Sequence, residues 1–175
     1  METATATLRK KALQQEPHSL VHLAGKYLTF RLGNEGYGLE ILKVQEIIGM
    51  QPITGIPRTP AAIKGVINLR GKVIPVIDMR IKFGMEAREA SRKTCIIVVQ
   101  TKHGAAALTL GVIVDEVSEV LEIESEAIEP APAFGSEIQT DFILGMAKTK
   151  DAVKILLDLD RVLTDRELSA ALHAG

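Results

Sequence analysis

Residues 63–80 read IKGVINLRGKVIPVIDMR, and this stretch predicts a β-hairpin. Branched aliphatic side chains, which favour extended backbone, lie on both sides of a short polar segment at 69–72. Arg70 and Gly71 stand in the middle of that segment, where glycine supplies the backbone freedom that a tight turn needs. We therefore expect strands near 65–69 and 73–78. Because proline cannot donate to a strand ladder, Pro75 indicates a sheet edge or a bulge.

Strand and turn patterns of the same kind recur on both sides of this hairpin. Alternating apolar and polar side chains predict a second hairpin, with strands near 26–32 and 37–43 around a glycine-rich turn. Further strands are expected near 94–100, 106–115, 142–147 and 153–158. Many short strands separated by turns indicate a mostly β protein, built as small barrels or a sandwich.

Three segments lack this β pattern. Residues 1–24 are mostly polar and are expected to form a flexible N-terminal tail. Residues 122–138 are acidic and contain prolines, so we expect a loop with at most one helical turn. Apolar residues at helical spacing predict a C-terminal helix within 160–175.

The spacing of a few residues indicates an internal duplication. A glycine precedes a glutamate by eight residues twice, and a glycine precedes an aspartate by thirteen residues twice. These matched pairs are Gly38 and Glu46 with Gly111 and Glu119, and Gly65 and Asp78 with Gly145 and Asp158. The segment that joins the two pairs is longer in the second half. We expect two similar five-stranded barrels within residues 25–165, near 26–88 and 89–159, which share a buried interface because each is too small to be stable alone.

Composition excludes several classes of function. The net charge is −1, so the chain lacks the excess of basic residues expected of a nucleic-acid-binding or lipid-binding protein. No apolar run is long enough to span a bilayer. The single cysteine, Cys95, cannot form an internal disulfide, and the four histidines show no metal-ligand spacing. A cytoplasmic protein without a metal or cofactor is expected.

No stretch of the sequence matches a catalytic motif. The glycines at 33–38 join two predicted strands, not a strand and a helix, and no P-loop lysine follows them. Cys95 opens an apolar strand, where a buried thiol is expected. No nucleophile, base and oxyanion-stabilising group are brought together by any motif, so we expect a non-catalytic protein.

Three stretches together are similar to the signature of the CheW-like domain family. They are residues 37–47, YGLEILKVQEI, residues 63–80 quoted above, and residues 111–117, GVIVDEV. The loop 128–134, with Pro130 and Pro132, adds to the resemblance, which covers about residues 26–165. It implies two intertwined SH3-like β-barrels, in agreement with the duplication. The long polar N-terminal tail departs from the family pattern.

The resemblance also implies an adaptor function. Members of the family couple transmembrane chemoreceptors to the histidine kinase CheA in bacterial chemotaxis arrays. The implied partners are the cytoplasmic hairpin tip of a methyl-accepting chemoreceptor and the CheW-like regulatory domain of CheA. The chain would then be cytoplasmic and recruited to receptor arrays at the membrane, without inserting into it.

By position, the resemblance assigns seven residues to a receptor-binding groove and two to the kinase contact. The groove residues are Val44, Glu46, Gly65, Asn68, Arg70, Gly111 and Val117. The kinase contact is assigned to Phe134 and Pro132.

Two explanations stay open for most of these positions. Val44 and Val117 are explained equally by core packing, and Gly65 and Gly111 by backbone geometry. Arg70 is different, because a guanidinium at a hairpin tip is exposed and available to the carboxylates of a partner. For Phe134, a loop phenylalanine either covers the end of a barrel or anchors an interface.

Three rival functions are weighed against this adaptor. An adaptor in a related non-motility chemosensory pathway would differ only in its partners. An RNA-binding small-barrel protein requires a basic face, which the neutral charge balance disfavours. An enzyme with an active site between the barrels requires catalytic groups that no motif supplies.

Overall fold

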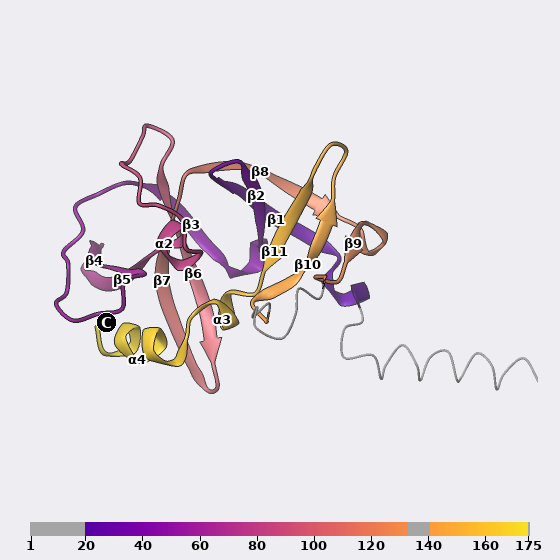
Figure 1. The fold of residues 1–175 in the computed structure, drawn as a ribbon. Coiled ribbons are helices and arrows are strands. Elements are labelled where there is room, and N and C mark those ends of the chain that lie inside the picture. The colour runs from indigo at the N-terminus through magenta and orange to yellow at the C-terminus, as the bar shows by residue number, and fades with distance from the viewer. Residues whose placement is uncertain (1–19, 133–140, 175) are drawn as a thin grey trace, which may run out of the picture.

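The computed structural model describes residues 20–132 and 141–174, which form a mostly β structure (Figure 1). One sheet has six strands in the order β8-β1-β2-β11-β10-β9, and the other has five in the order β3-β6-β7-β5-β4. The strands of the first sheet are β1 Gly25–Leu32, β2 Glu35–Glu40, β8 Glu116–Ile123, β9 Ile128–Glu129, β10 Ile143–Lys148 and β11 Val153–Leu157. The strands of the second sheet are β3 Val44–Gly49, β4 Ile63–Leu69, β5 Lys72–Asp78, β6 Cys95–His103 and β7 Ala106–Val114.

Short helices connect these strands and end the chain. They are the 3-10 turns η1 Leu20–Leu23, η2 Ile41–Lys43 and η3 Ser125–Ala127, and the α-helices α2 Met79–Lys82, α3 Leu159–Val162 and α4 Asp165–Ala174. The side chain of Asp78 accepts hydrogen bonds from the N–H groups of Arg80 and Ile81 in α2, and that of Asp158 accepts one from the N–H of Asp160 in α3. Thr164 and Glu167 form a reciprocal capping box at the start of α4.

Each sheet combines strands from both halves of the chain. The hairpin β1–β2 lies in the same sheet as β8 to β11, whereas the hairpin β6–β7 lies in the same sheet as β3 to β5. In the six-stranded sheet, the hairpin β1–β2 meets the hairpin β10–β11 through the parallel pair of β2 and β11. In the five-stranded sheet, the hairpin β6–β7 meets the hairpin β4–β5 through the parallel pair of β7 and β5. A boundary at residue 88 therefore does not separate the two sheets, because the halves exchange strands and are intertwined.

The topology confirms the duplication inferred from spacing. Both sheets follow the same order of equivalent strands, and the bridge of Thr54 to Val66 stands in the place of β9. Gly38 pairs with Leu156 and Gly111 pairs with Val76 in the two parallel contacts. The register also shifts in matching places on the second hairpins, just before Gly65 in β4 and just before Gly145 in β10.

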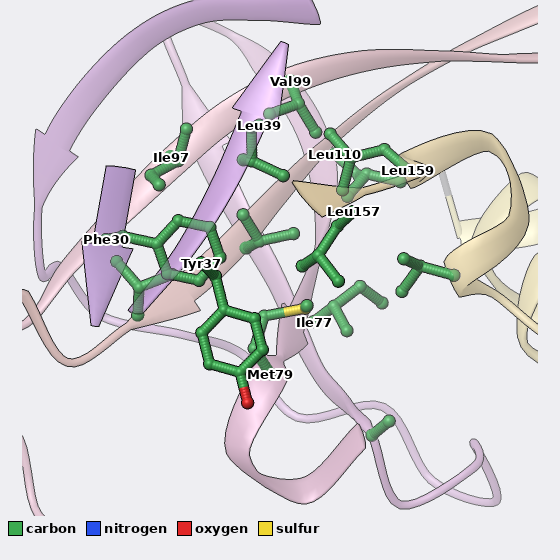
Figure 2. Close-up of a cluster of buried hydrophobic side chains, with 14 of the residues drawn as sticks. Phe30, Tyr37, Leu39, Ile77, Met79, Ile97, Val99, Leu110, Leu157 and Leu159 are labelled. Atoms are coloured by element: carbon green, nitrogen blue, oxygen red, sulfur yellow. The ribbon is translucent and has the colours of Figure 1, made fainter. Parts of the chain in front are cut away.

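Three clusters of buried apolar residues hold the sheets together. One cluster lies within the six-stranded sheet around Tyr27 and Leu156, and another within the five-stranded sheet around Ile67 and Val98. The largest draws residues from both sheets and fills the space between them. Figure 2 shows its central members, which include Phe30, Tyr37, Leu39, Ile77, Ile97, Val99, Leu110 and Leu157. Because this cluster is shared, neither sheet has a complete core of its own.

Several predicted boundaries are corrected by the structure. The strand expected near 37–43 ends at Glu40, and the turn η2 follows it. The strands β3, β8 and β9 and the helix α2 were not foreseen, and the end of β8 and all of β9 fall in the segment 122–138 that was expected to be a loop. Pro75 lies in β5, which is an inner strand, but it comes just before the first residue that pairs with β7. A missing N–H is harmless there, because the ladder to β7 begins only at Val76.

The two chain ends also differ from the expectation. Residues 20–24 do not belong to a tail, since Leu23 is buried and its carbonyl accepts a hydrogen bond from the Tyr27 hydroxyl at 2.6 Å. Residues 1–19 lie outside the described part of the chain. The expected C-terminal helix is divided into α3 and α4. The buried Lys82–Glu167 ion pair fastens α4 to α2.

Candidate functional site

The seven residues predicted for the receptor groove occupy three different settings. Glu46, Asn68 and Arg70 lie on the five-stranded sheet, on β3 and at the β4–β5 hairpin tip. Val44 and Val117 lie half-buried on β3 and β8. Gly65 and Gly111 are buried inside β4 and β7.

The β4–β5 hairpin tip is a two-residue turn. Leu69 pairs with Lys72, and the φ angles of Arg70 and Gly71 are 50° and 87°. Positive φ at both central residues is the geometry of a type I′ turn, whose twist matches that of the flanking strands. The side-chain carbonyl of Asn68 accepts a hydrogen bond from the Gly71 N–H at 2.8 Å. Asn68 therefore has a local structural role in supporting the turn.

Arg70 forms a two-point ion pair with Glu46. Its Nη1 donates to Glu46 Oε2 at 3.1 Å, and its Nη2 donates to Glu46 Oε1. The strands β3 and β4 stand at opposite ends of the strand order, so this ion pair links one edge strand to the hairpin tip beside the other edge strand. Hydrogen bonding from Arg70 lowers the pKa of the Glu46 carboxyl below its ordinary value.

The Arg70 guanidinium remains largely open to solvent despite this pair. The Arg70 side chain is 71% exposed, whereas that of Glu46 is 29% exposed. A guanidinium has five N–H donors, so a bidentate pair with one carboxylate leaves donors free for a second acceptor. A hollow of about 340 Å³ opens beside the pair, flanked by Gln45, Lys72 and Gln100. The arrangement suits recognition of polar or acidic groups on a partner.

Val44 and Val117 contact the central core from matching positions. Each lies on a strand that follows the crossing of the chain from one sheet to the other, and each packs against the large shared cluster. The ladder between β3 and β6 shifts register just after Val44. The ladder between β1 and β8, which contains Val117, has a similar shift. Both valines are partly exposed, so core packing and partner contact are compatible at these two positions.

Packing explains the two glycines. At Gly65, where φ is 150°, an added Cβ would come within 2.1 Å of the Thr54 carbonyl oxygen. At Gly111 an added Cβ would come within 2.7 Å of Ile96 Cγ2. Because both glycines are buried, any part that they have in binding would act through the shape of the sheet.

The structure describes one of the two residues assigned to the kinase contact. Pro132 is exposed and follows β9. Phe134 lies outside the described residues, so its role stays a prediction.

Exposed apolar side chains on β3 and β5 were missed by the sequence argument. Ile47 is 46% exposed and Val73 is 50% exposed, although both are large aliphatic residues within strands. The alternation of exposure along β3 could have indicated Ile47, but the strand itself was not foreseen. Such residues are suited to partner contact because covering them removes apolar surface from water.

The described residues hold little that could support chemistry. Burial raises the pKa of the Cys95 thiol, although a backbone hydrogen bond with Val117 partly opposes the shift. No group of three or more His, Cys, Asp or Glu side chains within residues 20–132 and 141–174 could hold a metal ion. Over the same residues, no helix has the length and apolar character required to cross a bilayer.

Comparison with known proteins places the chain in a family. The CheW-like domain model matches residues 26–167. The chain belongs to the CheW-like domain family. Among its curated relatives, the chemotaxis protein CheW of Klebsiella aerogenes is 40% identical over 144 residues, which cover 82% of this chain and 84% of the relative. The chemotaxis protein CheW of Rhizobium meliloti is 35% identical over 144 residues, with coverage of 82% and 90%.

A solved member of the CheW-like domain family has the same fold. The crystal structure of the scaffolding protein TtCheW from Thermoanaerobacter tengcongensis matches with a TM-score of 0.73 and 40% sequence identity. The match covers 82% of this chain and 95% of the other. The shared part therefore includes both intertwined sheets, and the described N-terminal turn η1 lies just before the segment matched by the family model.

Proposed function

We propose that this chain is a non-catalytic adaptor of bacterial chemotaxis arrays. In this role it binds the cytoplasmic hairpin tip of a chemoreceptor and the regulatory domain of the histidine kinase CheA. The observation that carries the proposal is the match of nearly the whole described chain to proteins named chemotaxis protein CheW and to a scaffolding protein. An adaptor acts by positioning its partners and by favouring one state of the kinase over another.

The receptor is proposed to bind the surface around the Glu46–Arg70 pair. Support comes from the exposed guanidinium, the hollow beside it and the partly exposed Val44 on the same strand as Glu46. An apolar residue next to a charged, hydrogen-bonding group is a common composition for the centre and rim of a protein interface. Gly65 and Asn68 support this surface by shaping the hairpin that presents Arg70.

The kinase is proposed to bind the loop that contains Pro132 and Phe134. Support comes from the sequence, because the segment between Glu119 and Gly145 is longer than its counterpart between Glu46 and Gly65. A longer loop on one half of a duplicated fold can carry a contact that the other half lacks. Two separate surfaces would allow receptor and kinase to bind together.

The proposal is tested by co-sedimentation with receptor-containing vesicles and purified CheA. We expect the chain to sediment with receptor alone, to retain CheA in the pellet, and to raise receptor-controlled autophosphorylation of CheA. No label from ATP is expected on the chain when CheA is omitted. Absence of binding to both receptor and CheA would overturn the proposal. Binding only to receptors of a pathway without motility output would select the related chemosensory adaptor.

A further inference from the structure

Two polar clasps connect the sheets where the chain crosses between them. The first joins Asp115, between β7 and β8, to Arg80 on α2 and to the turn that follows β1. Arg80 Nε donates to Asp115 Oδ1 at 2.9 Å, and the Gly33 N–H donates to Asp115 Oδ2 at 2.7 Å. This clasp spans both sheets, because α2 continues from the five-stranded sheet and Gly33 follows a strand of the other.

The second clasp lies at the corresponding crossing in the other half of the molecule, with the charge of the helix residue reversed. Lys43 Nζ donates to Asp160 Oδ2 at 2.9 Å, and the Lys102 N–H donates to Asp160 Oδ1 at 2.8 Å. Arg80 and Asp160 each stand two residues after the aspartate that caps their helix, so the duplication relates them. The short helix supplies the cation in the first clasp and the anion in the second.

The Asp160 clasp holds the turn that leads into the proposed receptor surface. Lys43 is the last residue of η2 and directly precedes Val44. Ile41 packs against the central core, and the Val44 N–H donates to the Ile41 carbonyl. Leu42, between these attachments, is 95% exposed, so the turn has no other apolar anchor at its tip. The ion pair and Ile41 thus support the position of Val44 from two sides, in addition to its pairing with Val99 of β6 and its packing against the core.

The surroundings of Asp160 favour its ionised form, which is the form that binds Lys43. Burial alone would raise the pKa of the Asp160 carboxyl, but the Lys102 N–H and the Lys43 ammonium outweigh it and hold the pKa below its ordinary value. The side chains of Lys43 and Asp160 are 25% and 31% exposed, against 14% and 17% for Arg80 and Asp115. The Asp160 clasp is thus the more accessible of the two.

We propose that Asp160 is a positioning residue for partner binding, which fixes η2 and thereby the start of β3 with Val44 and Glu46. This inference rests on the proposed function, because it concerns the same surface. It assigns a role in binding to a residue near the end of the chain that lies outside that surface. The carboxylate acts through Lys43 and the Lys102 backbone, without touching the partner.

The test compares Asp160→Asn with the matched variant Asp115→Asn at the other clasp. Hydrogen exchange measures the first effect. We expect the amides of residues 44–46 to exchange about tenfold faster in Asp160→Asn and to stay near the wild-type rate in Asp115→Asn. Lys43→Met, which leaves Asp160 and its bond to the Lys102 N–H in place, should reproduce the faster exchange.

Binding to receptor-containing vesicles measures the second effect. We expect Asp160→Asn to weaken binding roughly 3- to 30-fold, with recovery in the conservative variant Asp160→Glu. If Asp160→Asn does not fold, Lys43→Met carries the same test. Unchanged exchange at residues 44–46, or faster exchange with wild-type binding, would overturn the inference. Failure of the wild-type chain to bind receptor would instead overturn the proposed function, so the two failures are distinguishable.

Discussion

The two halves of this molecule share one topology but differ at the tips of their second hairpins. Arg70 stands five residues after Gly65, and Lys150 stands five residues after Gly145. Arg70 binds Glu46, the counterpart of Glu119. Glu119 and Lys150 line one hollow of about 600 Å³, yet among the described ion pairs none joins them.

The turn and the cation account for this difference. The β4–β5 turn has two residues, whereas four residues separate the paired Lys148 and Val153 in the β10–β11 hairpin. A guanidinium can hold both oxygens of a carboxylate, whereas an ammonium is a point charge on a flexible stem. The two halves thus share a backbone topology but differ in the length and charge contacts of these tips, and the proposed receptor surface lies on the half with the two-residue turn.

The largest expected effect concerns the two glycines before these tips. Gly65→Ala should lower the free energy of unfolding by about 3–5 kcal/mol, because the new Cβ meets a backbone carbonyl at a strained φ. Gly145→Ala should cost about 1–3 kcal/mol, since its Cβ chiefly meets the Ile128 side chain, which can shift. Urea unfolding of both variants measures the difference. Equal losses would show that the two sites are equally tight.

The second prediction concerns the segment between Glu119 and Gly145, which is longer than its counterpart in the first half. Phe134→Ser should weaken binding to the CheA regulatory domain by about 1–4 kcal/mol with little change in thermal unfolding. If Phe134 instead covers a core, the variant should lose about 3–5 kcal/mol of folding stability. Calorimetric binding and thermal melts, measured side by side, separate these cases. Wild-type binding by a folded variant would contradict the contact.

The third prediction compares the two hairpin tips directly. Arg70→Glu should weaken receptor binding by about tenfold or more, because it replaces an attraction by a repulsion at the interface. The matched control Lys150→Glu should bind normally. Both variants should melt within about 2 °C of the wild-type chain, since exposed ion pairs contribute little to stability.

A reversed pair sharpens this prediction. The double variant Glu46→Arg with Arg70→Glu restores an ion pair across the sheet edges but moves the guanidinium to β3. Receptor binding should stay weak in it if the partner contacts Arg70 itself. Recovery of binding would show that the pair matters only for closing the sheet.

The smallest expected effect concerns Glu40, which lies beside the Asp160 clasp. Burial is the main cause that raises the pKa of its carboxyl, with Asp158 and Asp160 adding to the shift and Lys43 opposing it. A raised folded-state pKa means that stability falls as pH rises through the window between the unfolded and folded values. Glu40→Gln should therefore raise Tm at pH 7, by on the order of 1–2 °C, and leave it unchanged near pH 4. A lower Tm at pH 7 would show that the attraction to Lys43 dominates.

Local patterns predicted the β4–β5 hairpin and the duplication well. Asn68 and Gly71 encode the turn through a side-chain hydrogen bond and a positive φ, and both features depend on a few neighbouring residues. Of the residues that mark the duplication, Asp78 also acts locally, because its side chain caps α2. Gly111, by contrast, allows close packing against Ile96 of β6, which is a tertiary contact.

The site was predictable only in part. Arg70 was identified by its position in the turn, but its bond to Glu46 was not, because 24 residues separate them in the chain. Ile47 was missed with β3, whose ladder partner β6 begins at Cys95 in the other half. The ion pair between Asp160 and Lys43 was also missed, since 117 residues separate them in the chain.

The sequence by itself determined most of the strands and turns, and that the chain consists of two similar halves. Alternating apolar side chains and turn residues act over a few residues, so they can be recognised without knowledge of the fold. Only the tertiary structure decided which strands the two halves exchange, that Arg70 meets Glu46, and that Asp160 binds Lys43. These contacts form because both sheets must share one large apolar core, and which edges then meet depends on the packing of the whole chain.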